Sequence, residues 1–166
     1  MAVCAVFLGA ALCSRAATRE KTAAVAAFSI AAILRDPKAL ARAHDVEVDG
    51  NQLYVPGKGG SIAIVDVSHP ERPELVWTKD LGDDAQTVLC RDGTVFVGGR
   101  DFYSIDVAEP TQAMVRKRLQ DRPRIDLING MISWGDHILY ANKAGWVGMV
   151  DVRRPDEPVL AGALDS

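Results

Sequence analysis

Three segments of this chain share one pattern, in which an apolar run ends in Asp-Val and is followed, after two more residues, by Pro. The copies are SIAIVDVSHP (61–70), DFYSIDVAEP (101–110) and WVGMVDVRRP (146–155). Their aspartates are 40 and 45 residues apart. A period of this length is typical of repeat architectures, in which each repeat is one supersecondary unit. The motif therefore predicts a scaffold, and a scaffold does not by itself define an activity.

Each repeat divides into four short β segments separated by Asp-Gly, Gly-Gly and Pro turn signals. The expected strands are 46–48, 53–55, 61–67 and 74–79, then 87–90, 94–97, 102–107 and 113–118, then 130–134, 137–141, 146–152 and 158–161. Four short antiparallel strands per repeat are typical of one β-propeller blade. We therefore predict an all-β fold, a partial β-propeller of about three four-stranded antiparallel blades. The blades are expected at about residues 44–80, 84–120 and 124–166.

The repeated aspartates have a structural interpretation. A short carboxylate accepts backbone N–H bonds in a tight corner, and the following Pro fixes φ and prevents further sheet pairing. A catalytic acid is not expected in every repeat. We therefore interpret Asp66, Asp106 and Asp151 as corner residues that belong to the fold.

Two further residue types point to the core. Tyr54, Phe96 and Tyr140 recur in the second strand of each repeat, so we expect them to pack between neighbouring sheets. Cys90 lies in an apolar strand, where a lone cysteine is more often a small buried hydrophobe than a nucleophile.

The Asp-Val-x-x-Pro motif, together with the Gly-Asn-x-Leu-Tyr-Val run at 50–55, resembles the LVIVD repeat. The resemblance covers about Ala43–Ala163 and is best in the first copy. That family is associated with β-propellers of secreted or surface proteins, so the resemblance implies this fold and location, with no catalytic residue to transfer. Closed propellers typically have about four to eight blades. Three copies therefore predict either an incomplete ring, with further blades missing, or self-association.

Residues 1–43 are expected to form a signal-like or linker segment. The apolar run 2–12 has the length of a signal-peptide core and is too short to span a bilayer, which favours a secreted or cell-surface location, with the cytoplasm as the alternative. A second apolar run, 23–34, is too short as well. Two interpretations remain open: a helix over 22–43, or an outer strand at 28–35.

Charge is unevenly distributed along the chain. The first 43 residues hold six Lys or Arg and two acids, whereas the remainder holds 13 basic and 20 acidic residues. Nucleic-acid binding needs a basic surface, so the acidic body argues against a nucleic-acid partner. We expect Asp83, Asp84, Arg122 and Arg124 to be solvated loop charges.

Candidate ligand-binding residues lie where the innermost strand of each repeat begins. His44 and Asp45 precede the first such strand, and Gln86 and Asn129 occupy the equivalent places. These four residues are expected either to line a polar pocket at the mouth of a central channel or to satisfy backbone groups at the strand starts. No catalytic set, metal-ligand spacing or cofactor motif occurs in the sequence.

The sequence therefore favours a non-catalytic binding scaffold with a protein or carbohydrate ligand. The alternative is a hydrolase or lactonase-type propeller enzyme with a metal or polar ligand in the channel.

Overall fold

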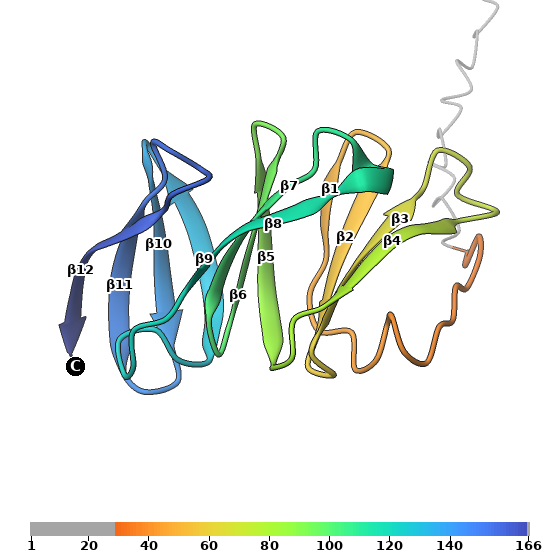
Figure 1. Ribbon diagram of the computed structural model, residues 1–166. Coiled ribbons are helices and arrows are strands. Elements are labelled where there is room, and N and C mark those ends of the chain that lie inside the picture. The colour runs from red at the N-terminus through yellow and green to blue at the C-terminus, as the bar shows by residue number, and fades with distance from the viewer. Residues whose placement is uncertain (1–28, 166) are drawn as a thin grey trace, which may run out of the picture.

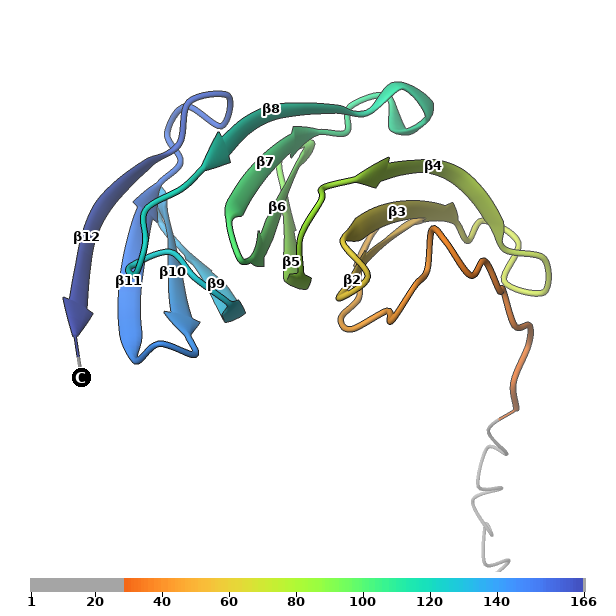
Figure 2. The same cartoon turned by 60° about the horizontal axis from the view of Figure 1, so that its bottom comes forward.

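The computed structural model describes residues 29–165, so the apolar run 2–12 lies outside the described residues. Three separate four-stranded antiparallel sheets follow one another along this part of the chain (Figure 1). With the bottom of the molecule tilted forward, the sheets are seen side by side as the blades of an open arc (Figure 2). The predicted all-β fold with three four-stranded blades is confirmed.

Each blade is a simple meander from its inner strand to its outer strand. The first blade holds β1 (Glu47–Asp49), β2 (Gln52–Gly57), β3 (Ser61–Asp66) and β4 (Glu74–Asp80). The second holds β5 (Ala85–Arg91), β6 (Thr94–Gly99), β7 (Phe102–Asp106) and β8 (Met114–Leu119), with a 3-10 turn at Pro110–Gln112 before β8. The third holds β9 (Ile128–Trp134), β10 (His137–Asn142), β11 (Trp146–Asp151) and β12 (Val159–Asp165).

Alternation along the strands gives every blade two apolar faces. We call the face toward the next blade in the chain the forward face and the opposite one the backward face. The forward face of the first blade carries Tyr54, Ile62 and Ile64, which pack on Val97 and Ile105 of the second blade. These side chains are almost fully buried, so stacking two sheets removes both apolar faces from water.

The second interface repeats this arrangement. Phe96 and Phe102 on the forward face of the second blade pack on Ile138 and Val150 of the third. The two phenylalanine rings stack with their centroids 5.8 Å apart. Two continuous cores therefore lie between three blades, and each blade depends on its neighbour.

The predicted alignment of the aromatic residues is correct at two positions and wrong at the third. Cross-strand pairing places Tyr54 and Phe96 at equivalent positions, opposite Ile64 and Ser104, whereas Leu139 has that position in the third blade. Tyr140 lies one residue later and packs on the backward face, with the core of the second interface. All three rings nevertheless lie between neighbouring sheets, as expected.

The N-terminal segment (residues 29–43) forms neither of the expected elements. It contains no helix, and its only β-bridge pairs Ala43 with Gly57. Ala39 and Leu40 pack against Val55 on the backward face of the first blade. The helix and outer-strand interpretations are therefore wrong for residues 29–43, because the segment crosses a sheet face and does not extend a sheet edge.

Candidate functional site

The repeated aspartates have the same geometry in all three blades. Oδ1 of Asp66, Asp106 and Asp151 accepts the backbone N–H two residues later, at 2.8, 3.0 and 3.0 Å. This is the hydrogen bond of an Asx turn, and it shapes the corner that ends the third strand of each blade. Bonds from the Ser68 hydroxyl and backbone N–H lower the pKa of Asp66, and the bond from Ala108 N–H lowers that of Asp106. Bonds from the Arg153 side chain and backbone lower the pKa of Asp151 to about 2.

The starts of the inner strands meet at the junction between the first two blades. His44 Nδ1 lies 2.7 Å from the carbonyl oxygen of Gln86. Because a carbonyl only accepts, Nδ1 carries the proton in this contact. Asp45 uses both oxygens: Oδ1 accepts Val46 N–H at 2.9 Å, and Oδ2 accepts Thr87 Oγ1–H at 3.0 Å and Val88 N–H at 3.2 Å.

The structure therefore brings three of the four candidate ligand residues together. His44, Asp45 and the backbone of Gln86 meet across the first junction, while the side chain of Asn129 is exposed at the start of β9. The Gln86 side chain is buried, and its Oε1 has no hydrogen-bond partner among the described residues.

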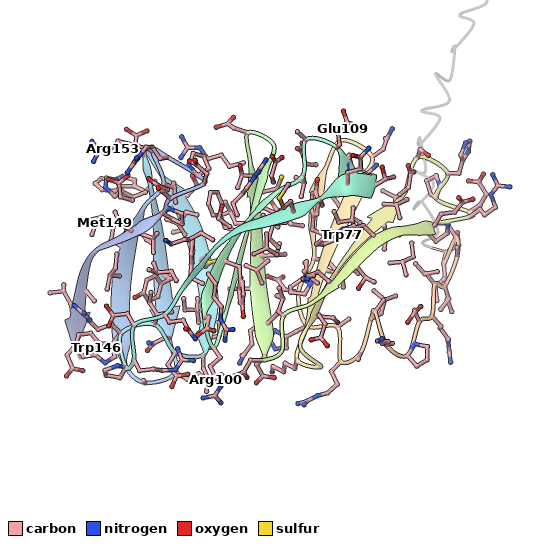
Figure 3. All side chains as sticks on the ribbon, in the orientation of Figure 1. Trp77, Arg100, Glu109, Trp146, Met149 and Arg153 are labelled. Atoms are coloured by element: carbon pink, nitrogen blue, oxygen red, sulfur yellow. The ribbon has the colours of Figure 1, made fainter. Side chains whose placement is uncertain are left out.

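A network of charged side chains lies at the blade end that holds Arg100, opposite the end that holds Arg153 (Figure 3). Asp101 is fully buried, and its carboxylate lies 2.5 Å from Arg118 Nη2 and 2.8 Å from Arg122 Nη2. Gln120 also donates to Oδ2 of this carboxylate at 3.1 Å, and the Tyr103 hydroxyl oxygen lies 3.5 Å from it. Two guanidinium groups therefore neutralise the charge of a carboxylate that is buried away from water.

The network continues between the blade-connecting segments. Arg100 lies 3.1 Å from Asp83 and 3.3 Å from Asp126, which lies 3.8 Å from Arg122. Asp83 and Arg122 are loop charges exposed by 37 and 39%, as expected, but both also take part in this network. Arg124 pairs with Asp121 instead, at 2.5 Å. The missed residue was Asp101, whose only signal in the sequence was a charge at the start of an apolar strand.

Cys90 is half-buried against the core between the first two blades. Burial, followed by the nearby Asp49 carboxylate, raises the pKa of its thiol to about 12. The thiol therefore stays protonated at neutral pH and is a poor nucleophile.

Neither a metal cluster nor a membrane span is found in the part of the chain that the structure describes. Among residues 29–165, no group of three His, Cys, Asp or Glu side chains is arranged to hold a metal ion. No helix in that range is long and apolar enough to cross a bilayer.

Comparison with known proteins locates the sequence family in the first blade. The family model of the LVIVD repeat matches residues 41–80, which include β1 to β4. No curated protein matches the chain.

Solved structures share the fold at low sequence identity. A protein from Lactobacillus plantarum is 12% identical with a TM-score of 0.62, over 74% of this chain and 42% of that one. The computationally designed Ika8 protein is 12% identical with a TM-score of 0.58, over 75% of this chain and 36% of that one. Glutaminyl cyclase from Myxococcus xanthus is 12% identical with a TM-score of 0.54, over 76% of this chain and 52% of that one.

The matched region spans between about a third and about a half of the length of these structures. At this identity the likeness concerns the fold alone, and these structures are propeller-like. The chain therefore carries the LVIVD repeat, in residues 41–80, on a β-propeller-type fold of three blades.

Proposed function

We propose that this chain is a non-catalytic β-propeller scaffold that binds a protein or carbohydrate partner. The observation that carries the proposal is the use of Asp45, whose two oxygens accept three hydrogen bonds at the first blade junction. A carboxylate engaged in this way holds two blades in register and has little capacity left for proton transfer. The polar end of the inner strands then serves as a rigid platform.

The partner and the location rest on sequence features. The apolar run 2–12 and the association of LVIVD repeats with exported propellers support a secreted or cell-surface protein. The exposed Asn129 amide offers both a donor and an acceptor, which suits sugar hydroxyls or a peptide backbone.

Binding is tested with the labelled 166-residue chain on an array of immobilised oligosaccharides and purified extracellular matrix proteins. We expect saturable binding to at least one probe. Asn129→Ala should lower the affinity at least about tenfold, which corresponds to the loss of roughly one to two hydrogen bonds. Asn51→Ala is the matched control, because Asn51 is also exposed but lies in the β1–β2 turn. Absence of saturable binding to every probe contradicts the proposal.

One observation supports the alternative, a hydrolase or lactonase-type enzyme. Since Nδ1 of His44 donates to the Gln86 carbonyl, the lone pair of the neutral ring lies on Nε2, as in a metal-ligating histidine. Calorimetric titration with Zn²⁺ and Ca²⁺ and an assay of lactone hydrolysis distinguish the two functions. A binding scaffold gives no turnover. Metal-dependent turnover that disappears in His44→Gln contradicts the scaffold.

A further inference from the structure

The forward face of the third blade is apolar and uncovered. Ile132, Trp134, Val147 and Leu164 are exposed by 63, 63, 56 and 76%. In the pairing between the second and third strands of each blade, Val147 occupies the position that Ile62 and Phe102 hold in the first two blades. Ile62 and Phe102 are exposed by only 1 and 0%, because the next blade covers them. Register therefore shows what kind of surface fits here: the backward face of another blade.

The backward face of the first blade is the matching surface. Val48, which pairs with Leu53, points to that side of the sheet and is exposed by 59%, and Val46, just before β1, is exposed by 58%. The N-terminal segment packs on Val55 and Ala63 in the middle of the sheet, and a hollow of about 810 Å³ lies between this segment and Val65, Val67 and Pro73. The exposure of Val48 shows that the inner-strand part of this face is uncovered.

The two internal junctions identify which residues would meet. At the first, the Asp49 carboxylate at the end of β1 lies 3.6 Å from Cys90 Sγ on β5. At the second, Arg91 at the end of β5 lies 3.5 Å from Ser133 Oγ on β9. In each case the last residue of one inner strand contacts the second-to-last residue of the inner strand in the following blade. At the free ends, this rule pairs Trp134 with Val48.

We propose that a second copy of this chain packs head to tail on the uncovered inner-strand parts of both faces, with Trp134 of each copy packed on Val48 of the other. At the internal junctions these positions hold polar or sulfur-containing side chains, whereas at the free ends both hold exposed apolar ones. A heterologous contact closes a ring when the rotation permits. Two copies of the three described blades give six, within the range of closed propellers.

This inference does not depend on whether the assembled ring binds or catalyses. It is tested by sedimentation velocity of the 166-residue chain. We expect a species of twice the 17.9 kDa chain mass. Trp134→Glu and Val48→Lys are each expected to raise the dimer dissociation constant at least about thirtyfold, as for the loss of a central apolar anchor. Both side chains are exposed in the single chain, so neither substitution should unfold it. The melting temperature of each variant checks that it is folded.

The double variant Trp134→Glu/Val48→Lys is expected to recover the dimer, because the head-to-tail contact places the new opposite charges together. Met114→Glu is the control, since Met114 is also exposed, by 52%, but lies on the outer strand β8. It should leave the dimer unchanged.

Three results overturn the inference. If the unaltered chain is a monomer, no second copy covers these faces. A dimer that is unaffected by Val48→Lys indicates two third blades packed face to face. A trimer or larger species excludes the two-copy ring.

Discussion

Tyr140 on β10 lies directly opposite Gly148 on β11, and a methyl group at Gly148 would overlap the Tyr140 ring. The same pair of positions holds Val55 and Ala63 in the first blade and Val97 and Tyr103 in the second. Tyr103 and Tyr140 donate their hydroxyl groups to Leu81 and Arg124 carbonyls, which precede β5 and β9, at 3.1 and 2.8 Å. The tyrosine thus changes strand between blades, and the opposite residue becomes smaller to admit it.

We expect Gly148→Ala to lower the free energy of unfolding by about 1–3 kcal/mol, because the overpacked Tyr140 ring must move away from the Arg124 carbonyl. Urea denaturation measures the change. Gly130→Ala is the control, since nothing lies within 4 Å of a Cβ there. The double variant Gly148→Ala/Tyr140→Val copies the first blade and should recover part of the loss. Equal effects of the two single variants would contradict the overlap.

The buried carboxylate of Asp101 gives a second prediction. Asp101→Ala removes the shared partner of Arg118 and Arg122 and is expected to cost about 3 kcal/mol, as for a broken buried ion pair. Glu74→Ala removes an exposed ion pair with Arg72 and should change stability by less than about 1 kcal/mol. Both are measured by urea denaturation. A similar small change in the two variants would show that Asp101 is not a stabilising centre.

The blades could be predicted from the sequence because their determinants are local. Turn residues and alternating apolar residues define each strand, and the observed bounds differ from the expected ones by a few residues. The one-residue shift of Tyr140 could not be predicted, because it depends on Gly148 across the sheet. The N-terminal segment was missed for a related reason: an apolar run can cover a face in an irregular conformation.

The positions of His44 and Gln86 at neighbouring strand starts could be predicted, but their hydrogen bonds could not. His44 and Gln86 were expected at neighbouring strand starts, and the structure places them 2.7 Å apart through a side chain and a carbonyl. The Asp101 network was not predictable, since its members come from the β4–β5 and β8–β9 connections, the β6–β7 turn and β8, and meet only in the folded chain. Sequence periodicity carries no information about such contacts.

Asp45 and Thr87 are expected to be coupled across the first blade junction. Asp45→Ala leaves the buried Val88 N–H without its acceptor, so we expect a loss of about 1–3 kcal/mol. Thr87→Val removes a single hydrogen bond to the same oxygen. A double-mutant cycle by urea denaturation should give a coupling energy of about 0.5–1.5 kcal/mol. Additive effects would show that the carboxylate does not link the blades.

The corner carboxylates should make the fold sensitive to acid. Arg153 lowers the pKa of Asp151 from 3.8 to about 2, so the ionised form is favoured in the folded chain. A depressed folded-state pKa stabilises the protein above the unfolded pKa, and this stabilisation is lost as the pH falls through the folded value. Asp151→Asn should therefore lower the melting temperature near neutral pH, and the difference should disappear between about pH 4 and about pH 2. Asp156→Asn changes an exposed carboxylate near the same corner and serves as the control in thermal melts over this range. A difference for Asp151→Asn that stays constant with pH would mean that the corner is held by geometry alone, without a contribution from the charge.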